Sequence, residues 1–272
     1  MIVGKRIITP AVQVTIRAAG DWLPSQVRAV RVPSTWEPGA EVSELIEAEW
    51  AAAIARPAMV LFDGPTSRLE GLDVDASGLT LRLSEIGYKN FVTTNLMHPE
   101  LAAVHGPGIL ANSLGVGVPV FTSDGFIIMG RRSDSVGWYP GRTHPFAGAM
   151  EPADAGDPFA AGLRELREEA ALDERHIISM RCIGVVEDFS IHQPEVIIRA
   201  DVRSRRDQIE SNIAREEHYE IHAIAATPAT VASAIENPVL SPAGVGALLL
   251  WGRSEWGDDW LEETVRNHCA AA

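Results

Sequence analysis

The sequence has few of the features that mark several common classes of protein. Only two of its 272 residues are cysteines, Cys182 and Cys269, so neither a disulfide framework nor a cysteine-ligated zinc site is expected. No stretch approaches the roughly 20 apolar residues that a membrane-spanning helix needs. Residues 1–10 lack the apolar core of a signal peptide. We therefore expect a protein of the reduced, cytoplasmic compartment that has no membrane partner.

Positive charge is also scarce. The chain has 23 Lys and Arg against 37 Asp and Glu, which gives a formal net charge of −14. Nucleic-acid-binding proteins usually carry a basic face, so this composition argues against a general nucleic-acid binder. The sequence also lacks a P-loop, a Ser-His-Asp signal and a dinucleotide-binding glycine fingerprint. An anionic ligand would therefore need local positive charge, from a bound cation or a few arginines.

The most informative segment that is present is the acidic run Arg164-Glu165-Leu166-Arg167-Glu168-Glu169. In an α-helix, Glu165, Glu168 and Glu169 would lie on one face because they are three and four residues apart. Like charges at this spacing repel unless a cation lies among them, and Mg²⁺ prefers carboxylate oxygens. The alternative interpretation is a solvated helix surface with ion pairs such as Arg164 to Glu168.

The segments around this run favour a ligand site. Asp157-Pro158 is typical of a helix start, and an apolar stripe follows that would pack on a sheet (Phe159, Leu163, Leu166, Ala170). Residues 146–152 before it contain glycine, where backbone can approach a ligand closely. Residues 125–132 are an apolar strand that ends in two arginines. A strand that ends in arginines, a glycine loop and an acidic helix, in this order, are suited to binding a phosphate ester together with a metal ion.

The segment resembles the Nudix box, G-x5-E-x7-R-E-U-x-E-E-x-G-U, where U is a bulky aliphatic residue. The residues that match are Gly148, Arg164, Glu165, Leu166, Glu168, Glu169 and Leu172. It departs from the pattern in three ways: Asp154 replaces the first glutamate, nine residues rather than seven follow it, and Ala171 replaces the final glycine. Because a left-handed cap costs a non-glycine residue roughly 1 kcal/mol, we expect this helix end to be capped differently.

Further segments resemble one Nudix subgroup, the UDP-glucose/UDP-galactose pyrophosphatases. They occur in the same order between about Glu49 and Arg253. The segments are Leu61–Pro65 with Arg68-Leu69, Leu79–Leu83, Gly87–Asn95, Leu114–Gly117 and Ser241–Gly244. Each match is short, and together they are moderately specific. Without the resemblance, Tyr88 and Asn95 could simply cover a core; with it, both are candidates for substrate binding.

The predicted fold class is α/β. The resemblance implies a Nudix α/β/α sandwich with a mixed sheet over residues 108–253, and a smaller α+β domain over residues 1–107 that would help to set substrate specificity. Residues 254–272 would form a tail. The sequence pattern predicts strands at residues 116–122, 126–131, 180–187 and 196–202, and helices at residues 41–55, 157–172, 228–235 and 244–251.

The resemblance implies metal-assisted hydrolysis of a diphosphate linkage. Mg²⁺, or Mn²⁺ in its place, would be bound by Glu165 and Glu169, with Glu168 as a further ligand or a water-orienting base. The carbonyl of Gly148 would complete the metal shell. Arg164 would hold Glu168 by an ion pair rather than contact substrate.

One more acid would come from a later strand, and Glu195 is preferred over Glu187. A solvated glutamate at a strand end is the alternative for either residue. Arg131 and Arg132 follow a strand and would contact phosphate, although one of them could point to solvent. His144 and His192 are not predicted to be catalytic, because a lone histidine is more often structural.

The predicted function is Mg²⁺-dependent cleavage of a UDP-glucose-like nucleotide sugar to UMP and a sugar 1-phosphate. One alternative is a Nudix pyrophosphatase for other nucleoside diphosphates, such as ADP-ribose or coenzyme A. Another is a catalytically silent, nucleotide-binding Nudix sensor. The expected partner is a small-molecule nucleoside diphosphate; the oligomeric state is left open, with a homodimer as one option.

Overall fold

The computed structural model describes residues 2–55, 62–134, 138–214 and 218–271, so Leu61 of the predicted substrate motif lies outside the described residues. The strands are β1 (Arg6–Ile8), β2 (Gln13–Trp22), β3 (Val27–Arg31), β4 (Pro65–Asp75), β5 (Gly78–Gly87), β6 (Gly115–Val118), β7 (Val120–Phe121), β8 (Phe126–Arg132), β9 (Thr143–His144), β10 (Phe146–Ala149), β11 (Ile177–Asp188), β12 (Gln193–Val202), β13 (His218–Ala225) and β14 (Ala270–Ala271). The helices are α1 (Gly39–Ile54), α2 (Tyr88–Phe91), α3 (Leu101–His105), α4 (Pro158–Ala170), α5 (Arg206–Glu210), α6 (Pro228–Ala234) and α7 (Pro242–His268). A π-helical turn, η2 (Val92–Met97), follows α2, and a 3₁₀ turn, η4 (Pro152–Asp154), precedes α4.

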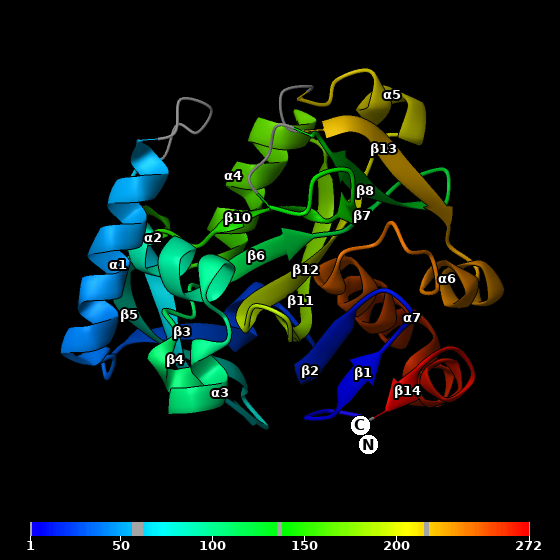
Figure 1. Ribbon diagram of the computed structural model, residues 1–272. Coiled ribbons are helices and arrows are strands. Elements are labelled where there is room, and N and C mark those ends of the chain that lie inside the picture. The colour runs from blue at the N-terminus through cyan, green and yellow to red at the C-terminus, as the bar shows by residue number, and fades with distance from the viewer. Residues whose placement is uncertain (1, 56–61, 135–137, 215–217, 272) are drawn as a thin grey trace.

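Eleven of the described strands form one mixed sheet, whose main path runs β13-β8-β7-β12-β11-β2-β1-β14 (Figure 1). β6 pairs with β12 in parallel, and β10 pairs with the other edge of β6. The single strand that we predicted at residues 116–122 is divided into β6 and β7 at Pro119. Proline has no N–H to donate to a strand neighbour, so the ladder is interrupted there.

Helices cover both faces of this sheet, as the α/β/α prediction requires. On one face the apolar stripe of α4, including Phe159 and Leu166, shares a core with Val116 and Ile198 of the sheet. On the opposite face α7 packs against the sheet and buries Trp251 together with the other residues of the second core. The predicted mixed α/β architecture is therefore confirmed, with α4 and α7 on opposite sides of the strands.

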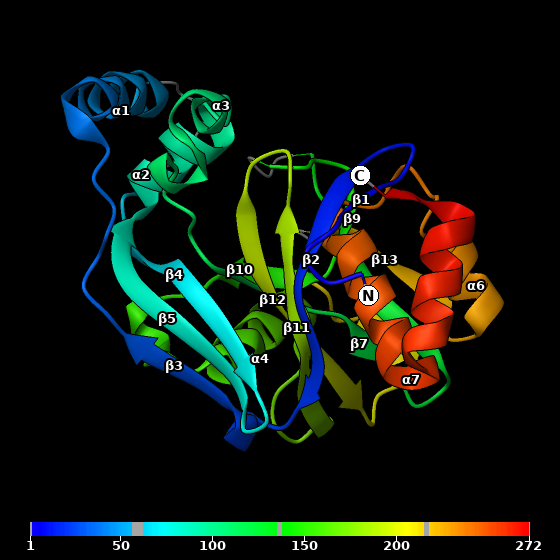
Figure 2. The same ribbon diagram turned by 90° about the horizontal axis from the view of Figure 1, so that it is seen from below.

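A second, three-stranded sheet, in the order β3-β5-β4, forms the smaller part of the molecule. Its leucines Leu79, Leu81 and Leu83 belong to the same core as Phe159 and Leu166 of α4. Figure 2 shows α4 between the small sheet and the large one, with α1, α2 and α3 grouped at one end of the small sheet. The acidic helix is thus packed between two sheets, which fixes its position.

Strand pairing crosses the predicted domain limits. β2, in the predicted N-terminal domain, pairs with β11 from Cys182↔Trp22 to Asp188↔Val14. α7 continues past residue 253 to His268, and β14 pairs with β1, so residues 254–271 belong to the main body rather than to a separate tail. Within the described ranges, no helix has the length and apolarity to cross a membrane.

The two ends of α4 follow different rules. At the start, the side chain of Asp157 accepts a hydrogen bond from the Phe159 N–H at 2.8 Å, as the Asp-Pro pair predicts. At the end, Ala171 adopts the left-handed conformation (φ 52°, ψ 32°) and its N–H bonds to the Leu166 carbonyl. Our expectation of a different cap was wrong: the alanine takes the geometry of the glycine that it replaces.

Candidate active site

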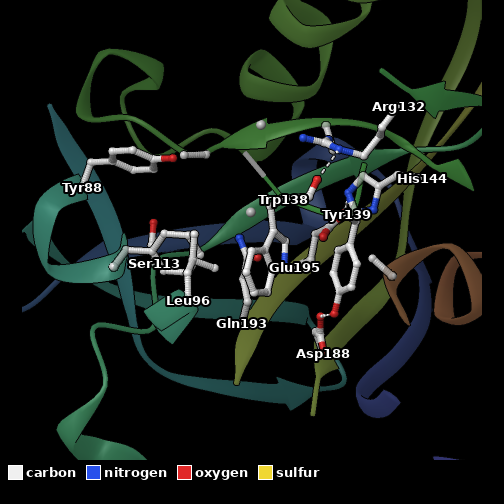
Figure 3. A pocket seen from close by; sticks show the side chains of 16 residues that line it. Tyr88, Leu96, Ser113, Arg132, Trp138, Tyr139, His144, Asp188, Gln193 and Glu195 are labelled. Carbon is white, nitrogen blue, oxygen red and sulfur yellow. Dashed lines mark hydrogen bonds and ion pairs between the residues drawn. The ribbon is translucent and has the colours of Figure 1, made fainter. Parts of the chain in front are cut away.

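A pocket of about 170 Å³ lies where the small part of the molecule meets the large sheet (Figure 3). One wall comes from α2 and η2, with Tyr88, Phe91 and Leu96. Another wall comes from Trp138 and Tyr139, which precede β9 along the chain. Its floor is formed by Glu195 of β12 and by residues 147–149 of β10. The pocket therefore collects residues that are far apart in the sequence.

The acidic face of α4 lies against β10. Glu169 Oε2 accepts a hydrogen bond from the Ala147 N–H at 3.0 Å and lies 3.1 Å from His218 Nε2. A Cβ added at Gly148 would overlap the carboxylate of Glu165, so glycine is what allows this close approach. Gly148 also lines the pocket, so the pocket and the acidic helix meet at this residue.

The three glutamates differ in exposure. The side chains of Glu165 and Glu169 are 8% and 2% exposed, whereas that of Glu168 is 59% exposed. The first two lie on the helix face that packs against β10, and Glu168 is turned toward solvent. The predicted trio of metal-binding carboxylates therefore consists of two buried groups and one surface group.

Arg164 connects the acidic helix to the loop before it. Its predicted ion pair with Glu168 is present but long, at 3.7 Å, whereas its contact with Glu165 measures 2.5 Å. The same guanidinium donates to the Ala149 carbonyl at 3.0 Å and lies 3.3 Å from the buried Asp154. Asp154, the residue that departs from the Nudix pattern, thus fixes the loop through Arg164.

The buried carboxyl groups have strongly perturbed acidities. Burial raises the pKa of Glu165 to about 8; Glu169 and Glu168 raise it further, and Arg164 opposes them. Burial also raises the pKa of Glu195 to about 8, with the charge of Arg132 acting in the opposite direction. A nearby cation would favour the ionised form of both groups.

The donor chemistry fits a hard cation, because carboxylate and carbonyl oxygens are what Mg²⁺ prefers. Glu165 and Glu169 meet the backbone of β10 around Gly148. Over the described ranges, however, no three acidic, histidine or cysteine side chains are arranged to hold a metal ion. The predicted ligand set is brought together only in part, since Glu168 lies at the surface.

The predicted substrate-binding residues separate into two groups. Tyr88, Arg132 and Gly148 line the pocket. Arg131 does not; it forms an ion pair with Glu220 at 2.9 Å on the surface. Asn95 is fully buried away from the pocket and donates to the Ile191 carbonyl at 2.8 Å. Its amide therefore connects η2 to the β11–β12 turn, which is a structural task.

The remaining parts of the pocket are the candidate additional acid, Glu195, and two aromatic side chains. Glu195 lines it, whereas the alternative, Glu187, pairs with Arg17 and His192. Trp138 and Tyr139 line it too, and the Tyr139 hydroxyl donates to Asp188 at 2.5 Å. No motif in the sequence marks these two aromatic residues, which lie between β8 and β9 and line the same pocket as Glu195.

No family model matches the chain, and no curated protein matches it. Among solved structures, a mutT/nudix family protein from Listeria innocua is 18% identical, with 55% of this chain and 98% of that chain covered and a TM-score of 0.41. The NUDIX domain of Shewanella oneidensis NrtR, complexed with ADP ribose, is 14% identical (57% and 97% covered, TM-score 0.40). A C. elegans Ap4A hydrolase is 12% identical (56% and 96% covered, TM-score 0.34). The likeness extends over about half of the chain.

Proposed function

We propose that the protein is a Nudix-type pyrophosphatase that hydrolyses the diphosphate of a nucleotide sugar, such as UDP-glucose, to UMP and a sugar 1-phosphate. The observation that carries this proposal is the meeting of the pocket with the acidic helix at Gly148. Burial of the Glu165 and Glu169 carboxylates has a desolvation cost, which their contacts with Arg164 and the Ala147 N–H offset. Glu165 meets at Gly148 a pocket that Arg132 also lines, and this arrangement supports a reaction at a phosphate ester.

Each residue has a role in this proposal. Glu165, Glu169 and Glu168, with the Gly148 carbonyl, would hold Mg²⁺ or Mn²⁺. When bound, the metal would neutralise charge on the diphosphate and make a bound water more acidic. Arg132 would bind phosphate oxygens. Glu195 would take the proton of the attacking water, a task for which a pKa of about 8 is well suited.

The first experiment incubates the full-length protein with UDP-glucose and Mg²⁺ and measures UMP. We expect turnover in the wild type and a loss on the order of 100-fold in Glu169→Gln. Glu210→Gln, on the exposed end of α5, is the matched control and should behave like the wild type. ADP-ribose and coenzyme A complete the substrate panel. Absence of product from every diphosphate would overturn the proposal.

One observation favours a second candidate, a catalytically silent nucleotide-binding protein. Arg164 contacts Glu165 directly, and the described acidic side chains do not converge on a metal position. This candidate predicts binding of UDP or UDP-glucose in a calorimeter, with no UMP formed at any Mg²⁺ or Mn²⁺ concentration. Detection of metal-dependent turnover would exclude it.

A further inference from the structure

Glu195 occupies an unusual position for a carboxylate. Its side chain is 7% exposed and lies over Gly117 of β6, where a Cβ would overlap Oε1. Oε1 is buried and accepts no hydrogen bond within the described residues. A buried acceptor without a donor costs about 1–3 kcal/mol. A nearby donor is therefore needed whenever this carboxylate is ionised.

The side chain that can supply this donor is His144 of β9. Its Nε2 lies 3.6 Å from Glu195 Oε1, and both residues line the same end of the pocket (Figure 3). This distance is slightly longer than a hydrogen bond, and catalytic hydrogen bonds are often long in the absence of substrate. The other ring nitrogen, Nδ1, lies 2.8 Å from the hydroxyl of Ser241.

Ser241 determines which ring nitrogen carries the proton. It is the N-cap of α7, and its Oγ accepts the Gly244 N–H at 3.0 Å. Ser241 is fully buried, so its hydroxyl proton needs a protein acceptor, and His144 Nδ1 is at the right distance. A neutral imidazole that accepts at Nδ1 carries its proton on Nε2. In the opposite tautomer, the serine proton would have no acceptor among the described residues.

We propose that Ser241 and His144 position Glu195 for proton transfer. Ser241 fixes the Nε2–H tautomer of His144, and that N–H orients Oε1 of Glu195. His144 is thus a positioning residue, since it acts through Glu195. Burial and the positive charge of Arg132 lower the pKa of His144, so the ring stays neutral near pH 7. The catalytic consequence rests on the proposed function, whereas the tautomer of His144 does not.

The tautomer is tested without any assay of activity. In full-length protein labelled with ¹⁵N-histidine, we expect Nδ1 of His144 to resonate as an unprotonated nitrogen and Nε2 as a protonated one. Ser241→Ala should shift the ring toward a mixture of tautomers. Thr227→Ala removes the equivalent N-cap of α6 and is the matched control, which should leave His144 unchanged. A protonated Nδ1 in the wild type would overturn the proposal.

The positioning role is tested by the pH profile of kcat. His144→Phe removes the donor, so we expect kcat to fall roughly 10- to 100-fold with little change in KM. The acid limb of the profile should move to higher pH, because Glu195 loses a group that favours its ionised form. His144→Gln, which retains an N–H, should recover most of the activity.

The other charged groups that act on Glu195 are Arg132, Asp188 and Glu169, and both variants leave them in place. An acid limb that is unchanged in His144→Phe, or a His144→Gln variant as impaired as His144→Phe, would contradict the positioning role. If the wild type hydrolyses nothing, the proposed function fails, and the nitrogen resonances still decide the tautomer.

Discussion

At the scale of single residues, two glycines set the distances within the site. Gly148 of β10 allows the carboxylate of Glu165 to approach the backbone of that strand. In the same way, Gly117 of β6 leaves room for the carboxylate of Glu195. Neither glycine has a positive φ, so what each position needs is space rather than a special backbone conformation. The sequence marks Gly148 through its place in the box, whereas Gly117 falls in the matching segment Leu114–Gly117 without any role that the pattern assigns to it.

Gly148→Ala tests this need for space. The added methyl group would displace Glu165, and a shift of about 1 Å in a catalytic group can cost on the order of 100-fold in rate. We expect kcat for UDP-glucose hydrolysis to fall by roughly that factor while the protein stays folded. Gly108→Ala is the control, since nothing lies within 4 Å of a Cβ there. Equal activity of the two variants would show that Glu165 does not need its present position.

At the scale of elements, α4 shows what a sequence can and cannot predict. The Asp157 cap and the apolar stripe are local signals, and both are confirmed. Which glutamates become buried is not a local property. Glu165 and Glu169 lie about 40° apart around the helix and face β10, whereas Glu168 is rotated by about 100° from Glu169. Only the packing of α4 between two sheets decides which of these directions is buried.

The left-handed alanine at the end of α4 gives a prediction about stability. Glycine adopts this conformation without the steric cost that Ala171 bears, so Ala171→Gly should stabilise the protein by about 1 kcal/mol. Ala160→Gly, on the exposed side of the same helix, should destabilise it by a similar amount. Urea denaturation measures both. Destabilisation by both substitutions would contradict this account of the cap.

At the scale of the whole molecule, the parts missed by sequence reasoning depend on contacts between distant segments. β2 joins the large sheet by pairing with β11, more than 150 residues away, and no local pattern records that partner. The pocket has the same origin, since Tyr88, Trp138 and Glu195 come from three separate segments. The motif makes Asn95 a candidate for substrate binding, but its amide connects η2 to the turn between β11 and β12.

The buried acids also affect the stability of the whole molecule. The pKa values of Glu165 and Glu195 rise from an ordinary 4.5 to about 8 on folding. Between these values the folded chain keeps protons that the unfolded chain releases, so stability falls as pH rises from about 4.5 to about 8. Each group contributes up to about 1.4 kcal/mol per pH unit. Below this window both states are protonated, and above it the loss is complete.

Glu195→Gln removes one of these two groups. In metal-free buffer, the urea midpoint of the variant should therefore fall less than that of the wild type as the pH is raised from 5 to 8. Glu210→Gln, at an exposed position, should follow the wild type across the same range. A constant difference between Glu195→Gln and the wild type would mean that Glu195 is ionised in the folded protein throughout. In that case a donor such as His144 would already offset the full cost of burial before any substrate or metal binds.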